Sequence, residues 1–231
     1  MRICIISDLH ANLEALHALP QSYDELWVLG DLVNYGPDPA AAIEFVRSRA
    51  SLVIRGNHDH AVGFAADCGC SPRFLMMAEA TRDYTIATLS DGDKRYLRQL
   101  PTSAQRQIEG MVFFLCHATP ANLLYEYRPP GSPLWDGAEE ASRGANVILA
   151  GHTHLQFSRR SGERLVINPG SLGQSKMGNP LARYALWDDG HFELRACEYP
   201  VETTARKITA MPLPDDVKRD LIDVLRTGTV P

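Results

Sequence analysis

Short apolar runs of strand length recur along the chain, and each is bounded by turn-forming or charged residues. They are rich in Val, Ile, Leu or aromatic residues and cover Ile3–Ile6, Leu26–Leu29, Leu52–Ile54, Met111–Cys116, Val147–Ala150, Leu165–Ile167 and Tyr184–Trp187. Apolar runs of this length between turn signals predict buried strands.

Segments with helical spacing separate the first three runs. Asn12–Leu19 places Leu13 and Leu16 on one face, and Ala40–Arg47 follows Pro37-Asp38-Pro39, which is a typical helix start. Alternation of strands and helices predicts βαβ units and a largely parallel first sheet.

The regular alternation of predicted strands and helices ends after residue 58. Residues 72–100 are predicted to be helical, short strands dominate from 104 to 198, and hairpin turns are expected at Ser161-Gly162 and Asp189-Gly190. Two short helices, broken by Pro212 and Pro214, are predicted near the end of the chain. We therefore expect one domain over residues 1–231, with a helical insertion at about 60–100 and a helical tail at about 201–226.

Composition narrows the class of protein. The chain has 231 residues, 45% hydrophobic and 22% charged, with a net charge of −5, which disfavours general nucleic-acid binding. No apolar stretch approaches the roughly 20 residues that span a bilayer, and the apolar start is too short for a signal peptide. Five cysteines, an odd number, fit a reduced and cytoplasmic setting. Cys68-Gly69-Cys70 lacks the spacing of redox or zinc motifs, so we expect no chemistry from it.

Polar side chains follow five of the predicted strands at the point where each strand ends. They are Asp8, His10, Asp31, Asn57, His58, His117, His152 and His154. Ligand sites in open α/β sheets lie at the carboxyl ends of strands, so these side chains are predicted to converge on one edge. Taken singly, most of these fragments are more often turns or hydrogen-bonded structural groups than ligands, and the prediction depends on their combination.

The combined set has a coherent chemistry. Two carboxylates, one carboxamide and four imidazoles favour transition metals such as Mn, Fe, Zn, Co or Ni over Ca. Seven ligands are too many for one tetrahedral ion and suit two ions that share a bridging carboxylate. Two such ions, about 3.5–4 Å apart, are a recurring device for displacement at phosphorus.

The order of these fragments resembles the calcineurin-like metallophosphoesterase family. The resemblance rests on Asp8-x-His10, Gly30-Asp31, Gly56-Asn57-His58-Asp59, His117 and Gly151-His152-x-His154, which appear in that order over residues 8–154. The segments 7–16 and 168–171 also resemble the small, single-domain bacterial and archaeal phosphodiesterase-like branch of the family.

This resemblance implies an α/β fold, a four-layer α/β/β/α sandwich of two mixed sheets flanked by helices. It assigns one metal to Asp8, His10 and His154, the other to Asn57, His117 and His152, and a bridging position to Asp31. It implies two divalent ions, with Mn expected first, and hydrolysis of a phosphoester by a metal-bridged hydroxide. It makes His58 the general acid, and we expect Asp59 to orient His58.

The sequence departs from the pattern at two positions. Asn34 stands where many relatives carry a second aspartate, and Cys116 stands before His117 where relatives often have glycine. Because that aspartate is not usually a direct ligand, metal binding is expected to survive.

Five further residues are candidates for substrate binding. Arg55 resembles the phosphate-gripping arginine of the protein-phosphatase branch, or it pairs with a surface acid. Asn12 either supports the site or caps the following helix. Residues 119–136 form a long, proline-rich loop in which Tyr125 and Arg128, with Tyr127, either select the leaving group or pack on the surface.

Three functions remain open from the sequence. The first is hydrolysis of a small phosphoester, with a phosphodiester favoured. The second is a protein or phosphomonoester phosphatase on the same centre, and the third is a non-catalytic scaffold, against which the presence of His58 and all seven ligands argues. The sequence does not specify the physiological substrate, the native metal pair or the oligomeric state, and it predicts no membrane partner.

Overall fold

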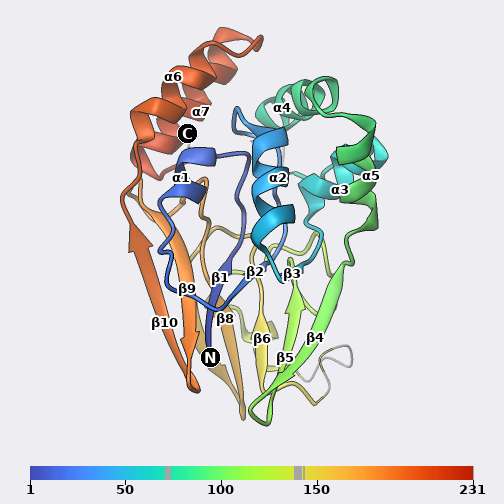
Figure 1. Ribbon diagram of the computed structural model, residues 1–231, viewed down its shortest axis with the longest axis vertical. Helices are drawn as coiled ribbons and strands as arrows, with labels where there is room; N and C mark the ends of the chain where they lie inside the picture. The colour runs from blue at the N-terminus through green and yellow to red at the C-terminus, as the bar shows by residue number, and fades with distance from the viewer. Residues whose placement is uncertain (71–73, 138–141, 143, 231) are drawn as a thin grey trace.

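The computed structural model, which describes residues 1–70, 74–137, 142 and 144–230, contains two five-stranded sheets (Figure 1). The first sheet has the order β10-β9-β1-β2-β3. Its strands are β1 Arg2–Ile6, β2 Glu25–Val28, β3 Leu52–Val53, β9 Ala182–Asp188 and β10 His191–Cys197. Strands β1, β2 and β3 run parallel, and the β9–β10 hairpin joins β1 antiparallel, so the sheet is mixed.

The second sheet is mixed as well and has the order β4-β5-β6-β8-β7. Its strands are β4 Ser103–Ile108, β5 Met111–Cys116, β6 Val147–Leu149, β7 Phe157–Ser161 and β8 Arg164–Asn168. The central strands β5, β6 and β8 are parallel, while β4 and β7 pair antiparallel at the two edges.

The main core lies between the two sheets. Ile3 and Ile5 of β1 face Phe113 and its neighbours on the second sheet, whereas Cys4 and Ile6 face the opposite way. The Phe113 ring meets Trp27 edge to face, with 5.5 Å between ring centroids. Because both faces of β1 are buried, its sequence is a continuous apolar run and not an alternating one.

Helices cover the outer face of the first sheet. They are α1 Leu13–His17, α2 Pro39–Arg49 and α5 Asp91–Gln99, which contribute Leu16, Ile43 and Leu97 to one buried cluster with β1, β2 and β9. In the part of the chain described, the outer face of the second sheet packs against Trp135 of a short 3₁₀ helix, η1 Pro133–Asp136. The predicted α/β sandwich of two mixed sheets flanked by helices is confirmed.

Four more helices gather at the upper end of the sheets in Figure 1. They are α3 Asn57–Phe64, α4 Leu75–Thr88, α6 Val201–Thr209 and α7 Asp215–Thr227, and they share a separate apolar cluster. Positions 72 and 73 of the predicted helical stretch lie outside the described residues. That these helices form an insertion and a tail within one domain stays a prediction. Of the helices described, none has the length and apolar character needed to span a bilayer.

The hairpins follow from their turn residues. Asp188 pairs with His191 around Asp189-Gly190, and Ser161 pairs with Arg164 around Gly162, which confirms both predicted turns. A third hairpin, around Glu109-Gly110, joins β4 to β5 with φ values of 51° and 81°. The sequence analysis missed β4 because it is a half-exposed edge strand without an apolar run.

Candidate metal centre

The strand ends of both sheets bring the seven predicted metal ligands to one place. Strands β1, β2 and β3 lead into Asp8, His10, Asp31 and Asn57, and strands β5 and β6 lead into His117, His152 and His154. All are buried except His152, which is half-buried. The convergence at the carboxyl ends of strands is the one that the sequence predicts.

Two groups of ligand atoms stand side by side. Asp8, His10 and His154 form one group, and Asp31, His117 and His152 form the other, with the ligand atoms of each group within 4.8 Å of one another. Asp31 Oδ2 lies 3.2 Å from His117 Nε2 and 3.9 Å from His10 Nε2. The Asp31 carboxylate therefore lies between the two groups.

In the first group, the tautomers of His10 and His154 leave the lone pairs of their Nε2 atoms facing each other. His10 Nδ1 donates to the Val33 carbonyl at 3.2 Å, and His154 Nδ1 donates to the Gln174 carbonyl at 2.6 Å. Each neutral ring then has a bare Nε2, and these two atoms are 3.1 Å apart. Two unprotonated nitrogens at this distance repel, and a shared cation would turn the repulsion into ligation.

In the second group, too, main-chain carbonyls set the orientation of the side chains. His117 Nδ1 donates to the Leu29 carbonyl at 2.7 Å, and Asn57 Nδ2 donates to the Cys68 carbonyl at 2.8 Å. These bonds point Asn57 Oδ1 at His117 Nε2, at 3.0 Å. Asp8 Oδ1 is buried without a hydrogen-bond partner among the described residues. The donor set therefore fits divalent cations by its chemistry and by its unmet acceptors.

The protonation states agree with this arrangement. Burial opposes ionisation of Asp8 and Asp31, yet the neighbouring imidazoles outweigh it and hold the pKa of both carboxyls below the usual range. Burial also works against charge on His117, but the Asp31 carboxylate dominates and raises the pKa of His117 to about 9. Burial lowers the pKa of His152 to about 3, so its imidazole is a neutral ligand at physiological pH.

Five of the predicted ligands occupy the left-handed backbone region. The φ values are 53° for Asp8, 47° for His10, 55° for Asp31, 66° for His152 and 61° for His154. For non-glycine residues this conformation costs about 1–2 kcal/mol each, and such strain gathers at functional sites.

His58 stands beside the ligands and has its own partner. Its Nδ1 lies 2.9 Å from Asn34 Nδ2, and its main-chain N–H donates to Asp31 Oδ1 at 2.9 Å. Burial lowers the pKa of His58 to about 4. Asn34 therefore sets the orientation of the imidazole.

Asp59 has a different role from the one expected, and the structure corrects that prediction. Its carboxylate accepts the N–H groups of Asp31 at 2.8 Å, Leu32 at 2.8 Å and Gly56 at 3.0 Å. Burial and the charge of Asp31 raise the pKa of Asp59 to about 7, although these donors favour the carboxylate. Asp59 fastens the loop after β2 to the start of α3 and does not orient His58.

A cavity of about 540 Å³ opens onto the metal centre. Asp31, Asn57, His58, His152 and His154 form its polar floor, and its walls come from Tyr35, Gly69, Cys70, Phe74, Tyr125, Tyr127, Lys176 and Val230. Lys176 escaped the sequence analysis, although it lies only five residues after Ser171 of the recognised segment. Its ammonium lies 4.7 Å from the Phe74 ring centroid, and burial lowers its pKa.

The structure brings two of the five predicted substrate-binding candidates to this cavity. Among the described residues, Tyr125 and Tyr127 are part of the wall, but Arg55, Asn12 and Arg128 are not. Arg55 Nη1 donates to the Arg98 carbonyl at 2.8 Å, and its guanidinium lies over the Phe64 ring. Arg55 therefore points away from the cavity, and its contact with phosphate stays a prediction.

Arg128 and Asn12 are structural. Arg128 is buried, donates to both carboxylate oxygens of Glu126 and stacks on Trp135, so it organises the loop of residues 119–136 from within. Asn12 accepts the N–H of Ala15 at 3.2 Å as the N-cap of α1, which confirms the capping alternative.

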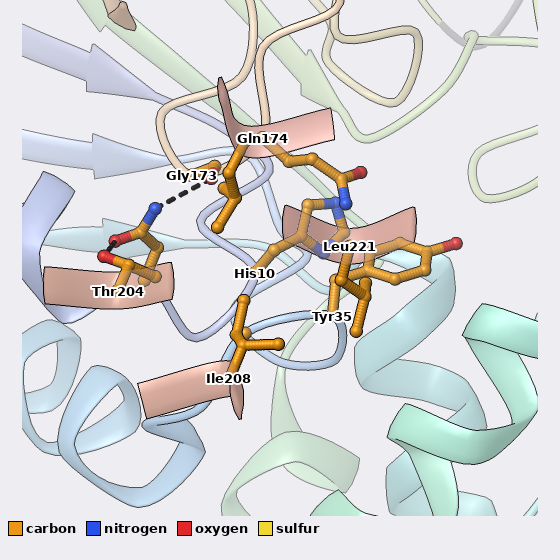
Figure 2. A pocket seen from close by; sticks show the side chains of 10 residues that line it. His10, Tyr35, Gly173, Gln174, Thr204, Ile208 and Leu221 are labelled. Carbon is orange, nitrogen blue, oxygen red and sulfur yellow. Dashed lines mark hydrogen bonds between the residues drawn. The ribbon is translucent and has the colours of Figure 1, made fainter. Parts of the chain in front are cut away.

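Residues of the C-terminal helices lie beside His10, a predicted metal ligand. Figure 2 shows Ile208 of α6 and Leu221 of α7 beside Tyr35 and His10, around a void of about 10 Å³. The Tyr35 ring meets His10 and His58 edge to face, with 4.8 Å between centroids in both pairs. Residues far along the chain therefore help to fix the orientation of a ligand on the first strand-end loop.

Comparison with known proteins agrees with this site. A model of the calcineurin-like phosphoesterase superfamily domain matches residues 1–189. An uncharacterised protein of Methanocaldococcus jannaschii is 27% identical over 92% of this chain and 94% of its own length. The phosphodiesterase YfcE of Escherichia coli is 24% identical over 82% of this chain and 88% of its own length.

A solved structure shares the fold over nearly the whole length. The metallophosphoesterase of Sphaerobacter thermophilus superimposes with a TM-score of 0.80 at 29% identity, covering 96% of this chain and 98% of that one. These matches confirm the resemblance found in the sequence. The chain belongs to the calcineurin-like phosphoesterase superfamily and is similar to its small bacterial and archaeal members.

Proposed function

We propose that this protein hydrolyses a phosphodiester at two divalent metal ions, with Mn²⁺ the first candidate. Asp8, His10 and His154 would hold one ion, Asn57, His117 and His152 the other, and Asp31 would bridge them. The observation that carries the proposal is His58. It is not needed as a ligand of these ions, and it faces a cavity whose floor is formed by residues of both metal groups.

The ions, when bound, supply Lewis acidity to the phosphoryl oxygens and activate a water nucleophile. His58 donates a proton to the departing ester oxygen. At a pKa of about 4 the free imidazole is mostly neutral, but the negative phosphate of a bound substrate favours the charged form. Asn34 accommodates that change, because its buried Oδ1, which has no partner among the described residues, can accept the Nδ1 proton after rotation of the amide.

Lys176 is the cation that faces the substrate in place of Arg55. Its ammonium lies at the cavity wall close to His58 and His154, and its charge acts on both imidazoles. The Lys176 ammonium supplies one positive charge besides those of the metal ions. This one charge matches the single negative charge of a phosphodiester. The case for a protein or phosphomonoester phosphatase rests on the acidic net charge and on Arg55, and the Arg55 side chain contacts Arg98 and Phe64.

The cavity also has room for an ester group on the leaving side. Phe74, Tyr125 and Tyr127 line it, and Tyr125 and Tyr127 are exposed by 38% and 53%. Aromatic walls of this kind bury an apolar or planar substituent at little entropic cost. A non-catalytic scaffold does not require an open cavity whose floor is formed by His58 and by two sets of metal ligands.

The function is tested with bis(4-nitrophenyl) phosphate and 4-nitrophenyl phosphate as matched substrates. We expect turnover of the diester to exceed that of the monoester, to vanish after dialysis against EDTA and to return with Mn²⁺. Full activity after complete removal of metal would refute the metal-dependent mechanism. A clear preference for the monoester would reassign the centre to the alternative phosphatase.

The role of His58 is tested by His58→Ala, with His60→Ala as the control on the same helix. General-acid catalysis contributes roughly 10²–10⁴-fold in rate, so His58→Ala should lose most activity on esters with poor leaving groups and least on nitrophenyl esters. Metal content should stay unchanged. His60 stacks on Phe64 and lies outside the lining of the cavity, so its variant should behave as wild type. Equal losses across the leaving-group series would show that His58 only positions the substrate.

A further inference from the structure

Two thiols lie next to His58, although the metal centre does not use them. Cys70 Sγ is 3.6 Å from His58 Nε2, and Cys68 Sγ is 2.7 Å from Cys70 Sγ. The ligand atoms of His58, Cys68 and Cys70 all lie within 4.8 Å of one another. Cys70 and His58 both line the 540 Å³ cavity, so the group is open to ions that enter it.

The backbone holds both thiols on the same side. Gly69 adopts a φ of 68°, and its N–H donates to Asp67 Oδ1 at 2.9 Å, which shapes the turn between the cysteines. The Cys68 carbonyl accepts the amide of Asn57 at 2.8 Å, so the turn is tied to the metal centre. This placement depends on the fold and not on the Cys-x-Cys spacing, so it cannot be predicted from the sequence.

One imidazole and two thiolates suit a thiophilic ion. Tetrahedral zinc, with bonds of about 2.3 Å to sulfur and 2.0–2.1 Å to nitrogen, sets its sulfur and nitrogen ligands about 3.6 Å apart. The observed separation of Cys70 Sγ and His58 Nε2 is 3.6 Å. Two thiolates on zinc stand about 3.8 Å apart. A small rotation about one Cα–Cβ bond would open the 2.7 Å between the sulfurs to that distance.

We propose that His58, Cys68 and Cys70 form a third metal site, which takes Zn²⁺ or another thiophilic ion. Binding displaces the protons of the two thiols and uses the lone pair of His58 Nε2. The fourth position of a tetrahedral ion stays open toward the cavity. The site differs in kind from the dinuclear centre, whose ligands are all nitrogen and oxygen.

Asn34 permits this use of His58. A metal on Nε2 requires the ring proton to be on Nδ1, where an acceptor must receive it. Asn34 lies 2.9 Å from that nitrogen, and its Oδ1 is buried without a partner among the described residues. Rotation of the amide would supply the acceptor.

Occupation of the third site has a consequence for the reaction, which rests on the proposed function of His58. A metal ion on Nε2 removes the atom that would donate the proton to the leaving group. The third site is therefore inhibitory, and the inhibition is greatest for esters with poor leaving groups. It comes from binding alone and requires no oxidation of the cysteines.

Binding is tested with Co²⁺, because thiolate ligands give an intense near-ultraviolet charge-transfer band that nitrogen and oxygen ligands do not give. The protein is first reduced, and its thiols are counted after denaturation. Wild type should develop the band and bind three ions per chain, while Cys68→Ser and Cys70→Ser should bind two and show little of it. Cys197→Ser, which changes a thiol on β10, is the control and should match wild type.

Absence of the band in fully reduced wild type would overturn the site, and so would a band that survives in both serine variants. Inhibition is measured by adding Zn²⁺ to the Mn²⁺-loaded enzyme. Zn²⁺ can also replace Mn²⁺ in the dinuclear centre, and this exchange changes the activity of wild type and Cys70→Ser equally. The difference in inhibition between the two proteins therefore measures binding at the third site. We expect at least tenfold weaker inhibition in Cys70→Ser, and equal inhibition would overturn the regulatory role. A cobalt band in a protein without phosphodiesterase activity would refute the proposed function and leave the third site standing.

Discussion

Replacing Asp59 distinguishes two accounts of its role. The sequence favours a partner of His58, whereas the structure shows a carboxylate that accepts three main-chain N–H groups at 2.8–3.0 Å. In Asp59→Ala, three buried donors lose their acceptor at once. Each unmet buried donor costs about 1–3 kcal/mol, so a loss of at least about 3 kcal/mol is expected. That is a large part of the 5–15 kcal/mol by which a typical domain is stable.

The chain offers a matched control for this variant. Asp59 and Asp93 are both N3 aspartates whose carboxylates accept the main-chain N–H of the N-cap residue, on α3 and α5 respectively. Asp93 accepts the N–H of Ser90 at 3.3 Å near the surface, and this hydrogen bond stays within the start of α5. Loss of a helix cap of this kind costs about 1 kcal/mol. Asp93→Ala should therefore destabilise much less than Asp59→Ala.

The assay is guanidinium unfolding in the presence of a chelator, so that bound metal does not contribute to the free energy of unfolding. Elemental analysis of the native variants then gives their metal content. Asp59→Ala should also bind less metal, because the loop that carries Asp31 loses its anchor. If Asp59→Ala unfolded within about 1 kcal/mol of wild type, kept its metal and lost activity only on poor leaving groups, Asp59 would act through His58 and the structural argument would be wrong.

Three further predictions concern the metal centre and the cavity. Asp31→Asn should lower occupancy at both metal positions together in elemental analysis, and a variant that keeps two ions per chain would refute the bridging role. Lys176→Met should raise KM for a diester about tenfold or more with unchanged metal content, whereas the control Lys218→Met, a half-buried lysine of α7 outside the cavity lining, should not. Because the metal-free pKa of His117 is about 9, metal must displace a proton below that pH, and Mn²⁺ affinity should fall about tenfold between pH 8 and pH 7. An affinity independent of pH in titration calorimetry would show that His117 is not a ligand.

The convergence of the candidate ligands was predictable from the sequence because their positions depend on strand ends. Apolar runs locate the strands, and parallel strands place their carboxyl ends on one edge, so Asp8, Asp31 and His117 could be brought together without coordinates. The ring orientations were not predictable. The partners of the histidine Nδ1 atoms are main-chain carbonyls such as Val33 and Gln174, and the sequence does not show which carbonyl a ring will meet.

Adjacency in sequence was misleading where the chain turns sharply. Asp59 follows His58 directly, yet α3 points the two side chains to different positions of the loop after β2, Asp59 to Asp31 and His58 to Asn34. Asn34, at a φ of 69°, reaches His58 from the loop after β2, and the sequence analysis treated it only as a departure from the family pattern. Cys70 and Lys176 lie in irregular segments, whose paths no hydrophobic period determines.

The strand-end residues are predictable from the sequence and the residues of the cavity walls are not. This difference has a physical cause that bears on substrate specificity. Strand ends set the metal ligands, while the cavity walls come from intervening segments that contain Phe74, Tyr125, Lys176 and Val230. Val230 also lies beyond residues 1–189, which the family model matches. Substitutions in these segments change the wall without moving a ligand, because the ligands are fixed by sheet pairing and main-chain hydrogen bonds. If the proposed function holds, the reaction and the choice of leaving group depend on different parts of the chain, so the leaving-group preference can be changed by substitutions in the walls while the metal ligands stay in place.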